Sequence, residues 1–407
     1  MKIFYVIADG LGDDKIKELG NRTPLEFAIK PNLDYFSIHS KYFFPKVIDN
    51  LAPESDVGVL ANLSYDPRLY DPGRGYFEAI GEDMNVEEGD LALRFNLGIV
   101  KGNTVESVRT QLTDDELKEI VDTIKKELTF PIDFDIKEGK VYRGAIVFKK
   151  SKTPFSMYVS NNEPGYKFKF FKNAKVGYAF KDNKKIRKIK ALRKDAIYTA
   201  KILNEFIDKV NSILRKHAFK PNYLFVRDAS IGPIDHPSFE EKFGLKALAI
   251  VGMPLEIGIS KYLGMKVAKI EEIEDFERVE EDLSIKANAL KRNYNKYDFI
   301  YIHIKQTDAA SHLGLFVEKS NIISKVDEYI FGTLKEIVKD DDIVVFSCDH
   351  ATSSLKKIHT SSNIPVMVSS SSFPKNELKF GEKSTKLKHE KLKEIKDLIP
   401  LLLKHDE

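Results

Sequence analysis

The segment KIFYVIADG, residues 2–10, predicts a buried β-strand that ends at an acidic residue. Its short apolar run is rich in β-branched and aromatic side chains, and an Asp-Gly pair ends it. The segments DFIYIHI at 298–304 and IVVFS at 343–347 have the same character, and acids and histidines follow each of them. Between them, residues 320–339 carry apolar side chains at helical spacing. This order of strand, helix and strand predicts a doubly wound, mostly parallel α/β sheet with ligand-binding residues at its strand ends.

The middle of the chain has a different pattern. Residues 113–127 begin with a capping sequence and predict a helix, and a second helix is expected over 195–216. Residues 141–149 and 175–180 predict strands. We therefore expect a smaller α+β domain inserted into the sheet-containing core, with the insert at 85–220 and the core at 1–84 and 221–407.

Two short apolar runs that follow the insert, 222–227 and 246–251, predict strands that return to the first sheet. The tail from about residue 375 is rich in Lys and Glu and ends in LIPLLL, which predicts a terminal helix docked on the core. A chain of 407 residues with 42% hydrophobic residues can bury the core of two or three such domains.

The composition excludes several classes of protein. The 65 basic and 62 acidic residues nearly cancel, so the chain lacks the positive field of a nucleic-acid-binding protein, and the Lys-rich stretch 181–194 is expected to be a solvated face. Cys348 is the single cysteine, which rules out an intrachain disulfide and favours the cytoplasm. The first apolar run is far shorter than the roughly 20 residues of a membrane span, and no cleavage-type signal follows it.

Seven residues at or near predicted strand ends form one set of candidate metal ligands, although they come from distant parts of the chain. Carboxylate and imidazole ligands together suit Mn²⁺ or Zn²⁺, whereas Mg²⁺ prefers oxygen ligands and Ca²⁺ rarely accepts histidine. Two ions need about this number of ligands. The set consists of Asp9, Ser55, Asp308, His312, Asp349, His350 and His359.

Each member of this set also has a purely structural explanation. An Asp after a strand often caps a turn, and Asp308 with His312 is also the spacing of an ordinary exposed pair on a helix. The histidines taken together favour a metal site, because five of the nine lie in or beside predicted strand ends or loops. Those five are His236, His303, His312, His350 and His359. His303 lies inside a predicted strand and is assigned to the core or to a supporting contact, whereas His359 is expected on the loop that follows Asp349 and His350.

Ser55, in PESDVG, is the candidate nucleophile. It lies at the start of a helix expected from about residue 56, where backbone N–H groups and the helix dipole favour an arriving phosphate. A metal contact would also lower the pKa of its hydroxyl. The alternative is that Ser55 merely caps this helix.

A series of longer motifs is similar to one known family. Together they resemble the archaeal-type, 2,3-bisphosphoglycerate-independent phosphoglycerate mutases of the alkaline phosphatase superfamily, in family order over nearly the whole chain. The motifs are VIADGLGD, RTPLEFAIKPNLD, ESDVGVLANLSYDP, GRGYFEAIG, YRGAIVF, LNEFIDKVNSILRKH, FEEKFGLKALAI, TDAASH and CDHAT.

This resemblance implies an alkaline-phosphatase-like core with two divalent ions, a nucleophilic serine and an inserted domain that grips the substrate. Mn²⁺ is the first expectation, Zn²⁺, Co²⁺ or Mg²⁺ also fit, and 2,3-bisphosphoglycerate is not needed. In the family's reaction, the phosphoryl group of 3-phosphoglycerate passes to the serine and then to the 2-hydroxyl of the reoriented glycerate.

The resemblance also assigns individual residues. It implies that Asp308, His312 and His359 hold one ion, and that the other is held by Asp9, Ser55, Asp349 and His350. Arginines would neutralise the phosphate and the carboxylate of this small phosphorylated hydroxy acid. The candidates are Arg74, Arg94, Arg143 and Arg227, among which Arg227 at a predicted strand end is preferred.

The chain departs from the family pattern at a few positions. Val59 stands where a histidine is usual, and NNEPG at 161–165 replaces an acidic DPH-type segment. Asp-Ala-Ser at 228–230 replaces a glycine-rich segment, and Ile257 stands where a lysine is usual. The Asp that usually follows the last histidine is missing from HTSSN. The metal and nucleophile positions all match.

Three functions therefore compete. The first is a cofactor-independent phosphoglycerate mutase. The second is a paralogue with the same metals and serine but a changed substrate, acting as a phosphatase, phosphomutase or phosphotransferase on another small phosphomonoester. The third is a catalytically inactive subunit or metal-binding scaffold, which requires all seven matching ligands to be without function.

Overall fold

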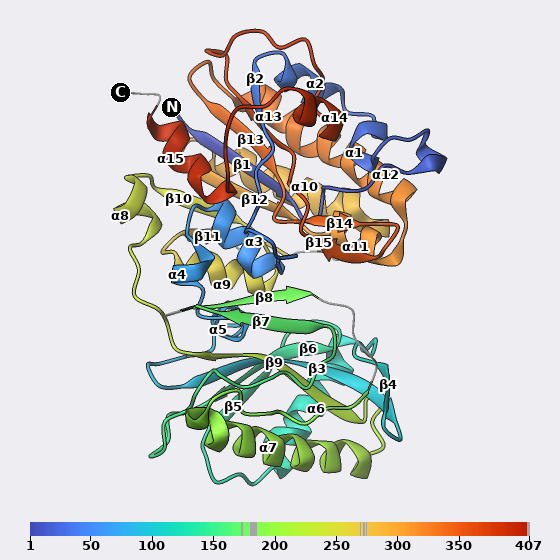
Figure 1. Cartoon of the computed structure of the whole chain (residues 1–407), viewed down its shortest axis with the longest axis vertical. Coiled ribbons are helices and arrows are strands. Elements are labelled where there is room, and N and C mark those ends of the chain that lie inside the picture. Colours follow the sequence, from blue (N-terminus) through green and yellow to red (C-terminus); the bar gives the residue numbers. More distant parts are fainter. Residues whose placement is uncertain (172–173, 180–184, 269, 272, 274, 405–407) are drawn as a thin grey trace. The chain divides into compact units, whose positions relative to one another are not determined.

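The computed structural model describes residues 1–171, 174–179, 185–268, 270–271, 273 and 275–404 (Figure 1). These residues form two compact units. Unit 1 contains Met1–Pro67, Pro237–Glu256 and Leu263–Glu407, and unit 2 contains Arg68–His236 and Ile257–Tyr262. The assignment of 85–220 as a substrate-gripping domain stays a prediction.

Unit 1 contains the doubly wound sheet that the sequence predicts, and it has seven strands. Neighbouring strands from β11 to β13 run parallel, whereas β16 runs antiparallel to both of its neighbours. The fold is therefore α/β with a mostly parallel sheet. The strand order is β11 (Lys266–Ala268), β10 (Ala247–Ile250), β12 (Phe299–Ile304), β1 (Ile3–Ala8), β13 (Ile343–Ser347), β16 (Val366–Ser369) and β2 (Ser40–Phe43).

Helical segments cover both faces of this sheet. On one face, the hydroxyls of Tyr5 and Ser347 donate hydrogen bonds to Asn62 Oδ1 at the end of α3, at 3.0 and 2.9 Å. On the other face, the ring of Phe346 lies 5.0 Å from that of Phe331 in the π-helical turn η4 (Asp327–Phe331). The helices of unit 1 are α1 (Pro24–Phe27), α2 (Pro31–Ser37), α3 (Ser55–Asn62), α8 (Phe239–Phe243), α10 (Val279–Asn293), α11 (Gln306–Leu313), α12 (Phe316–Val326), α13 (Gly332–Ile337), α14 (Glu382–Leu387) and α15 (Leu398–Leu403).

The expected apolar helix over 320–339 is present as α12, η4 and α13 in succession, and α15 contains the terminal LIPLLL. In the part of the chain that the structure describes, no helix combines the length and the apolar character that crossing a membrane requires.

Unit 2 is built on a five-stranded antiparallel sheet with two long helices. The predicted helices at 113–127 and 195–216 are confirmed as α6 and α7, and the predicted strand at 141–149 as β6. The strand predicted at 175–180 is confirmed as β8 up to residue 179. Residue 180, and residues 181–184 of the Lys-rich stretch expected to be a solvated face, lie outside the described residues. The five-stranded sheet contains β3 (Leu91–Lys101), β4 (Thr104–Ser107), β5 (Phe134–Glu138), β6 (Arg143–Phe148) and β9 (Tyr223–Ile231), and a separate hairpin contains β7 (Tyr166–Phe170) and β8 (Lys175–Ala179). The remaining helices are α4 (Pro67–Tyr70), α5 (Arg74–Gly81), α6 (Asp114–Glu127), α7 (Ile197–Lys216) and α9 (Pro254–Tyr262).

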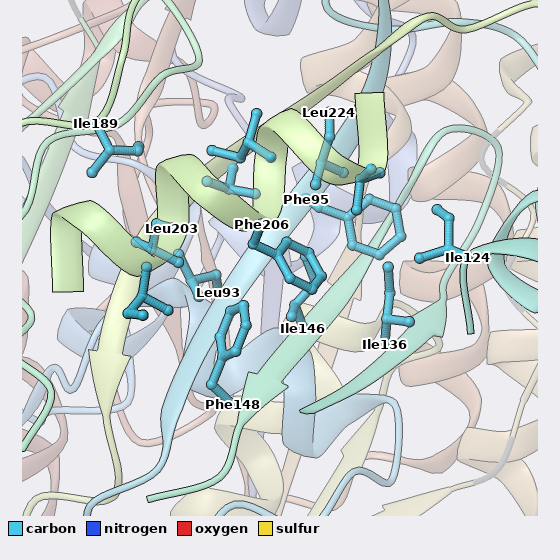
Figure 2. Close-up of a cluster of buried hydrophobic side chains, with 14 of the residues drawn as sticks. Leu93, Phe95, Ile124, Ile136, Ile146, Phe148, Ile189, Leu203, Phe206 and Leu224 are labelled. Carbon is cyan, nitrogen blue, oxygen red and sulfur yellow. The ribbon is translucent and has the colours of Figure 1, made fainter. Parts of the chain in front are cut away.

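The core of unit 2 lies between this sheet and α6 and α7 (Figure 2). Phe206 of α7 lies against the strands, with its ring 4.8 Å from that of Phe148 and 5.1 Å from that of Phe134 in edge contacts. Capping at Thr113, where the side chain and Glu116 bond each other's backbone N–H, fixes the start of α6. A rigid, well-packed sheet therefore supports the side chains on its other face.

One strand prediction was wrong. Residues 222–227 were expected in the first sheet, but β9 pairs antiparallel with β3 in unit 2. Both sheets need buried apolar strands, so the composition of the run does not identify its partner. The other returning strand, predicted at 246–251, is confirmed as β10 beside β12.

Candidate active site

The carboxyl ends of three adjacent strands in unit 1 carry the predicted aspartates. Asp9 directly follows β1, Asp308 lies on α11 after β12, and Asp349 follows β13. Because these parallel strands end at one edge of the sheet, their following loops meet there. Gly10 allows the closest approach, because it has φ +61° and an added Cβ would lie 2.8 Å from Asp308 Oδ1.

A first group of donor atoms comes from Asp308, His312 and His359. His312 Nε2 lies 3.3 Å from Asp308 Oδ2 and 3.2 Å from His359 Nε2, and His359 Nε2 lies 3.6 Å from Asp308 Oδ1. The helical spacing expected for Asp308 and His312 is confirmed in α11. His359 was expected in a loop, but it lies in β15 (Ile358–Thr360), which pairs with β14 (Ala351–Ser353).

Hydrogen bonds fix the tautomers of these two histidines. His312 Nδ1 lies 3.0 Å from the carbonyl of Lys357, and His359 Nδ1 lies 2.8 Å from the carbonyl of Pro53. A carbonyl only accepts, so each Nδ1 carries a proton that it donates. In the neutral imidazoles, both Nε2 atoms then turn lone pairs toward each other and toward Asp308.

A second group of donor atoms comes from Asp9, Asp349, His350 and Ser55. His350 Nε2 lies 3.2 Å from Asp9 Oδ1, 3.4 Å from Asp349 Oδ2 and 3.4 Å from Ser55 Oγ. Both of these carboxylate oxygens are buried without a hydrogen-bond partner. Four donor atoms from three separate loops thus converge on one point in a buried environment.

Thr352 joins the two groups. Its hydroxyl donates to Asp308 Oδ1 at 2.7 Å, so its oxygen accepts from His350 Nδ1 at 3.0 Å. This arrangement leaves His350 Nε2 unprotonated and directed at Asp9 and Asp349. His350 also lies within reach of the first group, because its nitrogen can share an ion with Asp308 and His359.

The ionisation of these groups reflects their burial. Burial raises the pKa of Asp9 well above its usual value, with the neighbouring Asp349 adding to the shift and Lys305 opposing it. Burial likewise raises the pKa of Asp349 to about 7. Burial also lowers the pKa of His359 to about 4, and that of His350 well below its usual range. Both histidines are therefore neutral at pH 7, as metal ligands must be.

Asp308 shows the opposite shift. Burial alone would raise its pKa, but His312 and His359 hold it well below its usual value. The two groups thus combine carboxyl oxygens with the unprotonated Nε2 atoms of His350 and His359, and His312 Nε2 lies within hydrogen-bond distance of Asp308. This donor chemistry fits divalent cations, and a cation would reverse the repulsion between Asp9 and Asp349.

Ser55 is the first residue of α3, and Glu54 occupies the cap position without a side-chain cap bond. The Ser55 hydroxyl instead faces the second group and also lies 3.4 Å from Lys305 Nζ. An oxygen here has a cation beside it and the free N–H groups of the helix start nearby. This geometry differs from that of a simple helix cap.

Besides Thr352, the sequence reasoning missed Lys305 and Glu256. Lys305 follows β12 and contacts Asp9, and its pKa is raised by Asp9 and Asp308 although burial opposes the shift. Glu256 lies 3.1 Å from His303 Nδ1, and together with Asp9 these side chains form a third buried group of donor atoms. The position of Lys305 directly after a central strand, like that of Asp9, was the available signal.

The four predicted arginines lie together in unit 2. Arg74 and Arg94 both pair with Glu78, at 2.9 and 3.3 Å. Arg94 lies directly opposite Arg227 on the paired strands β3 and β9. Burial, Arg74 and Arg227 lower the pKa of Arg94 to about 10. Arg143, on β6, helps Arg94 and Arg74 to hold the pKa of Glu78 low against the effect of burial.

Arg227 is 3% exposed and lies among residues at which the chain departs from the family pattern. Its Nε is 3.4 Å from Glu163 and 3.3 Å from Asp228, and its guanidinium carbon is 3.8 Å from the centre of the Tyr166 ring. Asn161 Oδ1 accepts from the backbone N–H of Asp228 at 3.1 Å. The departures at 161–165 and 228–230 therefore form one contact network.

Comparison with known proteins identifies the family. A family model described as 2,3-bisphosphoglycerate-independent phosphoglycerate mutase matches residues 44–220. A protein of that name from Aeropyrum pernix is 30% identical over 94% of this chain and 94% of its own length. The chain belongs to this family.

A further relative and two solved structures are also similar to this chain. Mutase 1 from Archaeoglobus fulgidus is 30% identical over 90% of this chain and 88% of its own length. A solved structure from Pyrococcus horikoshii has a TM-score of 0.79 and 24% identity over 100% of this chain and 98% of its own. The cofactor-independent phosphoglycerate mutase from Thermoplasma acidophilum has a TM-score of 0.63 and 24% identity, with both chains fully covered. These two structures share the fold.

Proposed function

We propose that this family member is a cofactor-independent phosphoglycerate mutase, which interconverts 3-phosphoglycerate and 2-phosphoglycerate through a phosphoserine at Ser55. The observation that carries the proposal is the convergence of Ser55 with three aspartates and three histidines. Such an enzyme would serve glycolysis and gluconeogenesis in the cytoplasm.

The seven residues fit two divalent ions, with Mn²⁺ as the first choice. Asp308, His312 and His359 would hold one ion, and the second would be held by Asp9, Ser55, Asp349 and His350. Bound ions would lower the pKa of the serine hydroxyl and neutralise charge on the transferred phosphoryl group. Metal analysis of the purified protein decides between Mn²⁺ and the alternatives Zn²⁺, Co²⁺ and Mg²⁺.

The chain's own groups then account for the transfer. Ser55 Oγ attacks phosphorus, the Oγ–P bond forms, and the bond to the glycerate 3-oxygen breaks. The ammonium of Lys305, 3.4 Å from Ser55 Oγ, lies where it can bind a phosphoryl oxygen. After the glycerate has turned, its 2-hydroxyl attacks the phosphoserine and the serine oxygen leaves. The proton lost by the attacking hydroxyl in each step is returned to the leaving oxygen.

The arginines of unit 2 are the proposed anion-binding residues. Arg74, Arg94, Arg143 and Arg227 present guanidinium groups that suit phosphate and carboxylate oxygens. Carboxylates already pair with three of them, so an incoming anion adds to an existing network. This network holds the arginine side chains in place before the substrate arrives.

The proposal is tested by incubating purified, Mn²⁺-loaded protein with 3-phosphoglycerate in the absence of 2,3-bisphosphoglycerate. Phosphorus NMR should show 2-phosphoglycerate appear, and mass spectrometry of quenched samples should find a phosphoryl group on Ser55. If metal-loaded, folded protein leaves 3-phosphoglycerate unchanged, the mutase assignment is wrong.

A second candidate function is phosphoryl transfer or hydrolysis on a different small phosphomonoester. It is favoured by the network around Arg227, where Glu163 and Asp228 place two carboxylates against one guanidinium. A site with this balance of charge is suited to a substrate with hydroxyls or a cation where glycerate has a carboxylate. Screening phosphomonoesters for phosphate release separates the two functions, because a mutase must protect its phosphoserine from water.

A further inference from the structure

Lys319 of α12 is completely buried, and its ammonium joins three segments of unit 1. Nζ donates to the carbonyl of Gly10 at 2.8 Å, to Asp13 Oδ2 at 2.9 Å and to the carbonyl of Thr352 at 3.3 Å. These three acceptors satisfy the three N–H groups of a lysine ammonium. Lys319 contacts none of the seven candidate ligands directly.

The two carbonyls belong to residues that orient candidate ligands. The N–H of Gly10 donates to Asp349 Oδ1 at 3.0 Å. The hydroxyl of Thr352 donates to Asp308 and its oxygen accepts from His350. Lys319 therefore acts on one ligand of the first group and two ligands of the second through the residues at 10 and 352.

Asp13 completes the arrangement from the other side. Its carboxylate is also fully buried and accepts the backbone N–H of Ser354 at 2.9 Å in addition to the ammonium of Lys319. Segment 9–13 is thereby tied to segment 352–354 in two ways, through the Lys319 ammonium that Asp13 and the Thr352 carbonyl share, and through the bond from the Ser354 N–H to the Asp13 carboxylate. A buried ion pair contributes little net stability compared with apolar side chains of similar volume, so its value lies in fixing geometry.

We propose that Lys319, paired with Asp13, is a positioning residue that sets the spacing between the two groups of metal ligands. The proposal rests on the proposed function, because it concerns the same two-ion site. In the absence of the ammonium, the carbonyls of Gly10 and Thr352 lose their shared donor, and the loop that carries Asp9 then depends on its remaining contacts, such as the backbone bridge at residues 11–12, to hold its position against β14. Metal binding by both groups at once then weakens.

The test measures metal binding directly. Lys319→Met removes the ammonium, and the double variant Lys319→Met/Asp13→Asn also avoids an unpaired buried carboxylate. The matched control is Lys286→Met, because Lys286 forms an equally buried ion pair at 2.8 Å with Asp282 on α10 and serves none of the loops at 10 or 352. Mn²⁺ binding is followed by calorimetry, and the electron paramagnetic resonance spectrum reports whether two Mn²⁺ ions lie close enough to couple.

We expect wild type and Lys286→Met to bind two coupled Mn²⁺ ions. The Lys319 variants should bind Mn²⁺ about 10- to 100-fold more weakly and lose the coupled spectrum, while circular dichroism shows a folded protein. A folded double variant with wild-type affinity and a coupled spectrum overturns the proposal. If wild type itself binds no coupled pair, the two-ion site and hence the proposed function fail as well, which is a different result.

Discussion

The two clusters of buried charge in this protein are built in opposite ways. The candidate ligands of unit 1 turn oxygen and nitrogen lone pairs toward one another, and Asp9 and Asp349 have carboxyl pKa values raised by burial. The arginines of unit 2 are instead paired with carboxylates, and they hold the pKa of Glu78 low although burial opposes this. The first cluster is a candidate site for cations, whereas carboxylates of the chain itself pair with arginines in the second.

The two clusters also differ in the contacts that hold their side chains in place. In unit 1, hydrogen bonds on the far side of each imidazole hold the donors in place despite their repulsion. In unit 2, Glu78 separates Arg74 from Arg94, so these guanidinium groups attract a common partner. The proposed cation site and the proposed anion site are thus held in place by different contacts, so substitutions can affect one without the other.

The largest effect is expected from Ser55→Ala. The variant lacks the hydroxyl that we propose as the nucleophile, so kcat for phosphoglycerate interconversion should fall on the order of 10⁴-fold or more. Ser212→Ala, on the exposed side of α7, should leave kcat unchanged. If Ser55→Ala is active, the reaction does not pass through a phosphoserine at Ser55, and the proposed role of this residue is wrong.

Phe206→Ala should lower the stability of unit 2 without changing Mn²⁺ binding by unit 1. Its ring contacts Phe134 and Phe148 in the core of unit 2, so truncation should cost about 3–5 kcal/mol in the free energy of unfolding. Ile197→Ala on the same helix, 62% exposed, should cost less than about 0.5 kcal/mol. Urea denaturation measures both, and Mn²⁺ binding by the still-folded Phe206→Ala protein should match wild type. Weakened Mn²⁺ binding would contradict the separation.

Arg94→Met should weaken substrate binding and leave metal binding unchanged. The guanidinium stays charged at pH 7 because its pKa is lowered only to about 10. Loss of a charged hydrogen bond to the substrate corresponds to roughly 1.5–3 kcal/mol, so KM should rise roughly 10- to 150-fold. Calorimetric Mn²⁺ affinity should be unchanged. The exposed Arg278, paired with Glu281 on the surface, provides a control in Arg278→Met.

The smallest effect concerns two buried carboxyls with opposite shifts. Burial raises the pKa of Glu382 to about 7 from 4.5, so its contribution to stability is present below pH 4.5 and is lost as pH rises through 7. Relative to wild type, Glu382→Gln should gain up to about 3 kcal/mol between pH 5 and pH 8. Glu78 has a lowered pKa, so its contribution is lost only as pH falls below about 4.5, and Glu78→Gln should show no such gain between pH 5 and pH 8. Thermal melts of both variants over this pH range measure the difference, and an equal pH dependence of the two variants would contradict the opposite shifts.

Much of the fold followed from local pattern. The strands β1, β12 and β13 are short apolar runs that end at acids, and α6 begins with a capping box, so both types of element could be predicted from neighbouring residues. The partner of β9 could not, because pairing depends on long-range contacts that an apolar run does not encode. The same limit placed His359 in a loop, since a three-residue strand such as β15 has too little periodicity to detect.

The candidate site was predicted in part. The seven ligands came from residue type, position at strand ends and family resemblance, and the structure brings all seven side chains together. Lys305, Glu256 and Thr352 were missed, because a lysine, a glutamate or a threonine has many structural uses and reveals its role only through its contacts. The departures near Arg227 were noticed as isolated positions, whereas their shared network required coordinates.

The groups that hydrogen-bond the Nδ1 atoms of His312, His350 and His359 differ in how easily a mutation removes them. His312 and His359 are held by main-chain carbonyls of Lys357 and Pro53, which every amino acid provides, so replacing those side chains leaves the acceptor atom in existence. His350 depends on the hydroxyl of Thr352, which a single codon change can delete. Substitutions of the anchoring residues therefore keep the hydrogen-bond acceptor of His312 and His359, whereas a substitution at Thr352 can remove that of His350.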